Sequence, residues 1–255
     1  MPPRPSGIVV FLTDFGHRDP YVGVMKGALL RVHPKATIVD LGHDVPPQDL
    51  VAGAFHLVAA IGHFPVGTVH TAVVDPGVGT ARRLLAASAH GCYWLAPDNG
   101  LLGTVLARDP DAAVRALDAG RLGLRDVSRT FHGRDVLAPV AGWLASGRYG
   151  FTALGPRVDD WRRGDDLFGG TPRIVQVDGY GNLISNVSAA AIGAARAVVV
   201  GDRTVPIRGT YGDVPHGEPV AVVGSHGRLE IAVHGGNAAV TLGLRRGAAI
   251  RLDGA

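Results

Sequence analysis

The sequence is poor in cysteine and has no long apolar run, and each shortage excludes a class of protein. Cys92 is the single cysteine among 255 residues, which excludes an internal disulfide framework and cysteine-rich zinc sites. No apolar run approaches the roughly 18 to 20 residues of a membrane span, so we expect no membrane partner. Because the first residues do not lead into a signal-peptide pattern, we expect a cytoplasmic protein.

Lysine is scarce too. Only two of the 25 basic residues are lysines, and the arginines are scattered along the chain without clusters longer than a pair. They meet 22 acidic residues, which leaves a net charge of +3. Binding of nucleic acid requires a patch or stripe of positive charge. We therefore expect no nucleic-acid partner.

Signatures of common cofactor sites are also missing. No Gly-x-Gly-x-x-Gly opens a helix after the first predicted strand and no Walker lysine is present, so a phosphate cradle is not predicted. The 11 histidines show no metal-ligand spacing such as His-Glu-x-x-His. We expect no cofactor and no metal. A metal site assembled in three dimensions from Asp14, Asp75 and His132 is kept as an alternative.

From residue 8 to about 150, short apolar runs alternate with helical patterns. The pattern predicts strands at 8–12, 37–41, 68–74, 84–89 and 93–96, and helices at 21–32, 49–61 and 135–144. Continuous apolar strands that alternate with helices are typical of an open α/β sheet. We therefore predict an α/β N-terminal domain with a largely parallel sheet.

The pattern changes after a polar stretch. Residues 157–166 are rich in arginine and aspartate and lead into Gly169-Gly170-Thr171-Pro172, which predicts a linker over 157–172 between domains at 1–156 and 173–255. Beyond it, short β-rich runs alternate with glycine and aspartate turns at 173–177, 182–186, 197–200, 204–207, 219–223, 228–233 and 249–252. We predict a smaller, mostly-β C-terminal domain.

Three predicted strands of the first domain end in a polar turn that contains glycine. The turns are Thr13-Asp14-Phe15-Gly16, Asp75-Pro76-Gly77-Val78-Gly79-Thr80 and Pro97-Asp98-Asn99-Gly100. Ligands of open α/β sheets bind beyond the carboxyl ends of the strands, so the turns predict one crevice. Asp14 is placed to accept hydrogen bonds from the two hydroxyls of a ribose, although an aspartate that caps the next helix fits equally well.

Six blocks of residues occur in one order along the chain. They are Thr13-Asp14-Phe15-Gly16, Val74-Asp75-Pro76-Gly77-Val78-Gly79-Thr80-Ala81-Arg82-Arg83, Pro97-Asp98-Asn99-Gly100-Leu101-Leu102, Phe131-His132-Gly133-Arg134-Asp135, Gly181-Asn182-Leu183-Ile184-Ser185-Asn186 and Ser225-His226-Gly227-Arg228-Leu229-Glu230-Ile231-Ala232. Together they resemble the S-adenosyl-L-methionine (SAM) hydroxide adenosyltransferase family. Its members are adenosine-forming SAM hydrolases and relatives of the SAM-dependent fluorinase and chlorinase. The resemblance runs from about residue 8 to 252.

The resemblance implies a catalytic set, a substrate site and an assembly. The catalytic set falls on Asp75, Arg82 and His132, and Asp14 matches the carboxylate that binds the ribose. Further substrate-binding positions fall in the second domain, on Asp178, Tyr180, Asn182, Tyr211, Ser225, Glu230 and Val233. SAM is then the substrate rather than a cofactor, and the implied assembly is a homotrimer with active sites between subunits.

The implied reaction is attack of water or hydroxide on the ribose C5′ of SAM, which gives adenosine and L-methionine. Methionine leaves as a neutral thioether, so no general acid is required. Asp75 or His132 accepts the proton, and the sequence leaves the choice open. Arg82 cannot be the base because a guanidinium stays protonated, so we expect it to orient Asp75 and stabilise negative charge.

Two rival functions remain besides a metal-dependent hydrolase that would use Asp14, Asp75 and His132. A SAM-dependent halogenase would carry tyrosine and serine at the positions of Asp75 and Gly133, so both residues favour water over halide. His226 stands where the halogenases have an arginine, which leaves its role open. A non-catalytic adenosine or SAM sensor would bind the ligand without turnover, whereas the complete catalytic set favours an enzyme.

Overall fold

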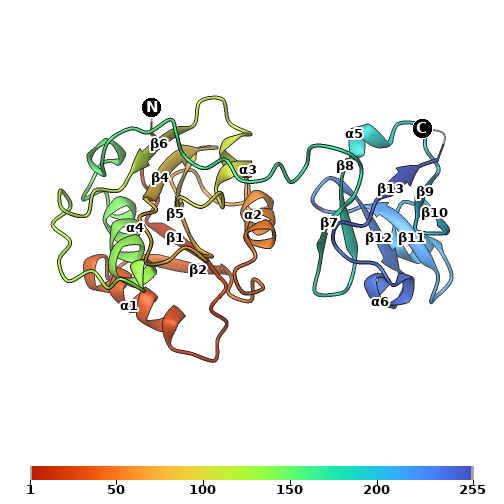
Figure 1. Cartoon of the computed structure of the whole chain (residues 1–255), viewed down its shortest axis with the longest axis horizontal. Helices are drawn as coiled ribbons and strands as arrows, with labels where there is room; N and C mark the ends of the chain where they lie inside the picture. The colour runs from red at the N-terminus through yellow and green to blue at the C-terminus, as the bar shows by residue number, and fades with distance from the viewer. Residues whose placement is uncertain (1, 254–255) are drawn as a thin grey trace. The chain divides into compact units, whose positions relative to one another are not determined.

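The computed structural model describes residues 2–253, which form two compact units with the division after Asp165. The first unit is α/β and the second is mostly β (Figure 1), which confirms the predicted fold class. The division falls inside the segment predicted as a linker, and the domain bounds 1–156 and 173–255 stay predictions. No helix within residues 2–253 combines the length and the apolar character that a membrane span requires.

The sheet of the first unit is parallel in its first four positions and antiparallel at one edge. Its strands are β1 (Ile8–Thr13), β2 (Thr37–Gly42), β3 (Val69–Val73), β4 (Leu84–Ala89), β5 (Cys92–Pro97) and β6 (Ala113–Ala116), in the order β2-β1-β3-β5-β4-β6. β4 runs antiparallel to both of its neighbours. The carboxyl ends of β1, β3 and β5 therefore lie along one edge of the sheet.

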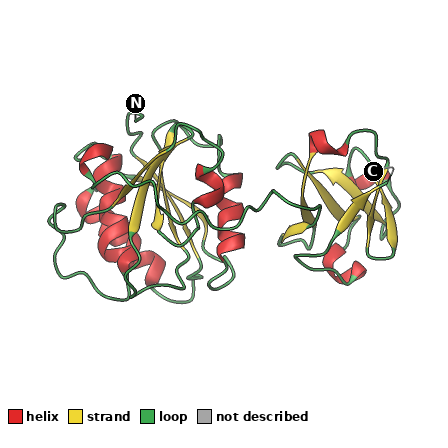
Figure 2. Ribbon diagram, turned by 45° about the horizontal axis from the view of Figure 1, so that its top comes forward, coloured by secondary structure: helices red, strands yellow, loops and turns green. Residues whose placement is uncertain are grey.

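Helices cover both faces of this sheet (Figure 2). α1 (Tyr21–Val32) and α4 (Ala138–Ala145) pack together on one face, and α2 (Leu50–Ala59) and the short α3 (Gly103–Leu106) lie on the other (Figure 1). α2 begins where Asp49 accepts a hydrogen bond from the Ala52 N–H at 3.0 Å, which satisfies a backbone donor of its first turn.

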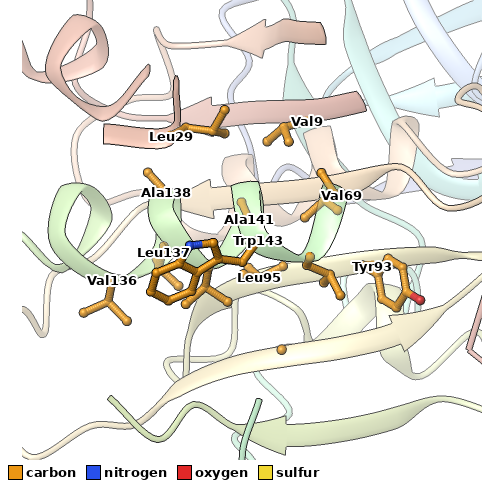
Figure 3. Packing of buried hydrophobic residues seen from close by; sticks show 14 of the residues in the cluster. Val9, Leu29, Val69, Tyr93, Leu95, Val136, Leu137, Ala138, Ala141 and Trp143 are labelled. Carbon is orange, nitrogen blue, oxygen red and sulfur yellow. The ribbon is translucent and has the colours of Figure 1, made fainter. Parts of the chain in front are cut away.

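The main core lies between the sheet and the α1–α4 face (Figure 3). Val9, Val69 and Leu95 point from neighbouring strands toward Leu29 of α1 and Ala141 of α4, and all five are fully buried. Alternate strand residues share a face, which is why the continuous apolar runs can fill both faces of the sheet. Burial of a valine or leucine of this kind stabilises the fold by about 1.5–3 kcal/mol.

The predicted helix over 135–144 is present, but it begins with a wider turn. A π-helical turn, η1 (Gly133–Leu137), precedes α4, and the Ala138 N–H bonds to the Gly133 carbonyl. Pro139 follows and has no N–H to donate, so the regular ladder is broken at the start of the helix. His132 stands directly before this turn, at the edge where β1 and β3 end.

The second unit consists of two antiparallel sheets. One has the order β11 (Pro219–Val223), β12 (Arg228–Val233), β8 (Leu183–Ser188), β7 (Ile174–Val177), and the other β10 (Arg203–Pro206), β9 (Ala197–Val200), β13 (Ile250–Leu252). Two short helices, α5 (Ala189–Ile192) and α6 (Ala238–Leu242), were not predicted. Single turns of 3₁₀-helix lie at η2 (Phe151–Ala153) in the first unit and at η3 (Tyr211–Asp213) in the second.

The polar stretch after residue 157 is attached to the first unit. Arg83 donates to the carboxylates of Asp98 and Asp160, at 2.8 and 2.7 Å. Asp98 is buried, and its second oxygen accepts from the Arg162 N–H at 2.8 Å. The third polar turn named from the sequence therefore anchors the chain on its way out of the first unit.

Candidate functional site

A cavity opens at the carboxyl ends of β1 and β3, with a volume of about 300 Å³. It is lined by Asp14, Phe15, Tyr21, Pro47, Gln48, Val73, Asp75, Val78, Thr130, Phe131, His132 and Gly133. Two of the three polar turns predicted to share a crevice contribute to it, those of Asp14 and Asp75. The turn of Asp98 does not.

Arg82 joins Asp75 to His132. Its Nε lies 2.7 and 2.8 Å from the two oxygens of Asp75, and Nη2 donates to Asp75 Oδ2. Nη1 and Nη2 each lie 3.1 Å from His132 Nδ1. The side chains of Asp75 and Arg82 are each 7% exposed, so the ion pair is shielded from water. The three residues form one connected group although up to 57 positions separate them in sequence.

The surroundings of His132 favour the neutral ring. Burial lowers the pKa of His132 and the charge of Arg82 lowers it further, while Asp75 and Asp135 act in the opposite direction without reversing the shift. A guanidinium has only donors, so Nδ1 must offer its lone pair to Arg82. The hydrogen of the neutral ring is therefore on Nε2.

One oxygen of Asp14 is engaged. Asp14 Oδ2 accepts from the Gln48 N–H at 2.7 Å, and within residues 2–253 the structure gives Oδ1 no partner. Gln48 has a φ of 64°, a left-handed conformation that is costly for a residue with a side chain. The loop that carries Gln48 is thus held in a strained form beside the carboxylate.

An aromatic wall completes this cavity. The rings of Phe15, Tyr21 and Phe131 meet edge to face, with centroids 5.6 to 5.8 Å apart. The Arg134 guanidinium stacks over Phe131 at 5.1 Å from the ring centroid. These rings give the cavity an apolar side beside its charged groups.

A second cavity, of about 650 Å³, lies in the second unit. It is lined by Asp178, Tyr180, Asn182, Tyr211, Ser225, His226, Glu230, Ala232, Val233, Gly235, Gly236 and Asn237. All seven substrate-binding positions carried over to this unit from the sequence resemblance are among them. The predicted site residues therefore line two cavities, one in each unit, except Arg82, which contacts two lining residues of the first.

Polar groups of the second cavity bind one another. Asp178 accepts hydrogen bonds from the backbone N–H groups of Tyr180 and Asn182, at 2.9 and 2.8 Å, and from the Asn182 amide at 3.0 Å. The Tyr211 hydroxyl donates to buried Glu230 at 2.7 Å. Burial first, and then Glu230, raise the pKa of Tyr211 to about 12. Tyr211 therefore stays protonated through the neutral range.

No group of three or more histidine, cysteine, aspartate or glutamate side chains within residues 2–253 is arranged to hold a metal ion. In the alternative set of Asp14, Asp75 and His132, the Arg82 guanidinium occupies the space between Asp75 and His132. Its positive charge opposes a cation there.

Comparison with known proteins identifies the family. The N-terminal domain model of the SAM hydroxide adenosyltransferases matches residues 9–155, and the C-terminal domain model matches residues 172–251. The chain belongs to the SAM hydroxide adenosyltransferase family. The resemblance carried by the six sequence blocks is thereby confirmed.

Relatives of this chain include proteins named as SAM hydrolases and as fluorinases. A protein of Thermus thermophilus named (R)-S-adenosyl-L-methionine hydrolase is 43% identical, covering 96% of this chain and 98% of its own length. A fluorinase of an Actinoplanes species is 28% identical, covering 97% of both chains. The crystal structure of an uncharacterised conserved protein of Thermotoga maritima superimposes with a TM-score of 0.88 at 32% identity, covering 96% of this chain and 99% of that one.

Packing explains one of the two positions at which this chain differs from the halogenase pattern. A Cβ atom at Gly133 would lie 3.1 Å from Met25 Sδ and 3.3 Å from a methyl group of Val73. These distances are tighter than ordinary contacts, so a serine there requires its neighbours to move. Glycine at position 133 thus fits the close approach of α1 and β3 to the start of η1.

Sequence reasoning did not assign all residues of the two cavities. Phe15 and Phe131 lie inside matched blocks, directly beside Asp14 and His132, and this adjacency was an available signal. Tyr21, Gln48 and Asn237 carry no such signal, because their places in the cavities depend on the fold of distant segments.

Proposed function

We propose that this chain hydrolyses SAM to adenosine and L-methionine. The observation that carries the proposal is the Asp75–Arg82–His132 group at the wall of a cavity that also contains Asp14. It is supported by the relative of 43% identity, which is named as a SAM hydrolase. The fluorinase relative is more distant, at 28% identity.

In the proposed step a water oxygen attacks C5′ of the ribose in line with the C5′–S bond. The O–C5′ bond forms, the C5′–S bond breaks, and its electron pair goes to sulfur, which leaves as the neutral thioether of methionine. The water loses one proton to the enzyme and then to solvent. Holding the water in line supplies an entropic advantage that reaches roughly 7–11 kcal/mol in well-oriented intramolecular reactions.

We assign the proton to Asp75. His132 uses the lone pair of Nδ1 toward Arg82 and carries its hydrogen on Nε2, so its neutral ring offers a donor rather than a base to the cavity. Asp75 is a carboxylate that takes a proton directly, a role worth ~10² to 10⁴ in rate. The Nε2–H group of His132 then orients the attacking oxygen.

Arg82 holds both partners in this arrangement. Its guanidinium stays protonated and grips Asp75 through Nε and Nη2 while its Nη atoms face His132. A lysine has one point charge and cannot make these contacts together. We therefore expect Arg82→Lys to lower turnover strongly.

We further propose that Asp14 binds the ribose and that the second cavity binds the rest of SAM. Asp178, Asn182 and Ser225 are assigned to the adenosine and methionine parts, with Tyr180 and Tyr211 beside the adenine. Glu230 and the Val233 backbone complete the set, as the family resemblance implies. Asp14 Oδ1, which has no partner within residues 2–253, supports this assignment.

The decisive experiment is to incubate the purified protein with SAM in ¹⁸O-water and to analyse the products by mass spectrometry. We expect adenosine with label in its 5′-hydroxyl, together with unlabelled methionine. Adenosine without label would refute attack by water at C5′. Activity lost on addition of EDTA and restored by a metal would refute our proposal that no metal is required.

The same assay distinguishes the two rival functions. With added chloride or fluoride, a halogenase would form a 5′-halogenated nucleoside, whereas we expect adenosine alone. A sensor would bind SAM without forming any product.

We also propose a homotrimer whose active sites lie between subunits, as in the family pattern. A ring of three subunits forms three equal contacts and closes on itself. The test mixes inactive His132→Ala protein with inactive Asn182→Ala protein under conditions of subunit exchange. Recovered activity supports shared sites, and no recovery despite proven exchange contradicts them.

A further inference from the structure

A second polar chain of contacts lies behind Asp14, outside the cavity. Lys26 Nζ donates to Asp40 Oδ2 at 2.7 Å. His43 Nε2 lies 3.0 Å from Asp40 Oδ1, although the ring N–H is poorly aligned with that oxygen. His43 Nδ1 lies 2.9 Å from Thr13 Oγ1, and Thr13 Oγ1 accepts from the Phe15 N–H at 3.3 Å. The contacts run from the protein surface to the turn that carries Asp14.

The inner members of this chain are completely enclosed. Thr13 is 0% exposed and His43 is 1% exposed. A buried polar group that loses its hydrogen-bond partner is destabilising, so the contact between Thr13 Oγ1 and His43 Nδ1 helps to hold this part of the fold. Neither residue lines the cavity, and the proposed mechanism uses neither of them.

The chain of contacts has a direction. Thr13 Oγ1 accepts from the Phe15 N–H, which leaves the hydroxyl hydrogen of Thr13 for His43 Nδ1. Burial raises the pKa of Asp40, but contacts with Lys26 and His43 outweigh it and leave that pKa below its usual value. The charged Asp40 then favours a hydrogen on His43 Nε2. From Lys26 to the Phe15 backbone every contact thus pairs a donor with an acceptor, although the His43 Nε2–H is poorly aligned with Asp40 Oδ1.

His43 holds the turn from a second side. Its carbonyl oxygen accepts from the Gly16 N–H at 2.8 Å. Gly16 has a φ of 63°, which glycine adopts without strain. Thr13 and Gly16 flank the Asp14–Phe15 pair, and both contact His43. Thr13 does so through its side chain, and Gly16 through its backbone N–H.

We infer that His43 and Thr13 are positioning residues, which fix the direction of the Asp14 carboxylate so that Oδ1 faces the ribose hydroxyls. The inference rests on the proposed function, because it takes Asp14 as the ribose ligand. The Gln48 N–H holds Asp14 Oδ2 from the cavity side, and the His43–Thr13 pair holds the backbone from behind. When Asp14 Oδ2 and the backbone of the turn are both restrained, Oδ1 of Asp14 remains for the substrate.

The test is the substitution Thr13→Val, which keeps the shape of the side chain and removes its hydroxyl. The matched control is Thr71→Val, at a buried threonine of β3 whose hydroxyl has no partner within residues 2–253. The readouts are the dissociation constants of adenosine and 2′-deoxyadenosine, together with kcat and KM for SAM. A merely structural role would change the melting temperature without changing selectivity for the ribose hydroxyl.

For Thr13→Val we expect adenosine to bind about tenfold more weakly, because a misdirected Asp14 carboxylate weakens a charge-assisted hydrogen bond to the ribose. Binding of 2′-deoxyadenosine should change much less, so the selectivity shrinks. KM for SAM should rise while kcat stays within about twofold. Thr13→Ser should restore the selectivity, and Thr71→Val should leave it unchanged. Unchanged selectivity in folded Thr13→Val overturns the inference.

A second pair of variants covers the case in which Thr13→Val does not fold. His43→Asn keeps an acceptor at the place of Nδ1, whereas His43→Leu keeps none. We expect His43→Asn to keep the ribose selectivity and His43→Leu to lose it. Equal selectivity in both variants overturns the inference. Failure of the proposed function gives a different result. If Asp14 is not the ribose ligand, Asp14→Asn will not change the ribose selectivity of the wild-type protein.

Discussion

The two cavities differ in how their polar groups are held. In the first unit Asp75 and His132 line about 300 Å³, and Arg82, which is not a lining residue, contacts both of them. In the second unit about 650 Å³ is bordered by glycine turns and by Tyr180, which is 81% exposed. In the first cavity, Arg82 fixes the Asp75 carboxylate and the His132 ring through direct contacts. In the second cavity, Asp178 and Asn182 are held by contacts within their own turn.

Because of this difference, we expect substitutions in the two cavities to change different kinetic constants. An interaction that is stronger in the transition state than in the ground state changes kcat, whereas one made equally in both changes KM. We expect substitutions around Asp75 to act on kcat and substitutions around Tyr211 to act on KM.

The largest effect is expected for Asp75→Asn, which keeps the shape and removes the charge. Turnover should fall by at least ~10², because the proposed proton acceptor is lost. The matched control is Asp178→Asn in the second cavity, where the carboxylate organises its own turn. There we expect KM to rise with little change in kcat. A steady-state assay with SAM measures both, and near-wild-type turnover in Asp75→Asn would remove that residue from the mechanism.

The second prediction concerns acid stability of the first unit. His70 is buried, stacks on Trp94 at 4.1 Å, and has no hydrogen-bond partner within residues 2–253 for either ring nitrogen. Burial lowers its pKa to about 4. The unfolded ring takes up a proton below a pH of about 6.5, and the folded ring does so only near 4. The contribution of neutral His70 to the free energy of unfolding is therefore fully present above pH 6.5, and about 3 kcal/mol of it is lost as the pH drops to 4.

Tryptophan fluorescence measures this effect in the first unit, because Trp94, Trp143 and Trp161 all lie there. We expect His70→Leu to flatten the loss of stability between pH 6.5 and 4. His63→Leu, the same change at an exposed site, should keep it. An unchanged acid profile in His70→Leu would show that another group is responsible.

The third prediction concerns the attachment of residues 157–165 to the first unit. Asp98→Asn removes the buried charge that binds Arg83 and the Arg162 N–H, and should destabilise the first unit by about 1–3 kcal/mol. Limited proteolysis should then cut within residues 157–165 more readily. Asp160→Asn is the control, because Asp160 is exposed and binds the same arginine. We expect it to leave the melting temperature unchanged, and equal effects of both variants would contradict this attachment.

The smallest effect is expected in the second cavity. Tyr211→Phe removes the hydroxyl that donates to Glu230, and we expect KM for SAM to rise about five- to tenfold at constant kcat. Tyr180→Phe is the matched control, because its exposed hydroxyl has no protein partner within residues 2–253. A fall in kcat for Tyr211→Phe would contradict the expectation that the second cavity affects KM alone.

Much of the architecture could be predicted from local pattern. Ile8–Thr13 and Val69–Val73 are continuous apolar runs, and Tyr21–Val32 has helical spacing that ends before a proline. These signals lie within the segments that they shape. The edge strand Ala113–Ala116 was missed because it is short and rich in alanine, and its pairing partner β4 stabilises it.

The sequence by itself determined the two-unit architecture, the six ordered blocks and the residue types available for the chemistry. Only the tertiary structure decided that Arg82 lies between Asp75 and His132, that the hydrogen of His132 is on Nε2, and that His43 stands behind the turn of Asp14. The physical reason is distance along the chain. Apolar spacing is a local property that shapes each segment, whereas hydrogen bonds depend on atoms of separate segments brought within about 3 Å by packing of the whole core.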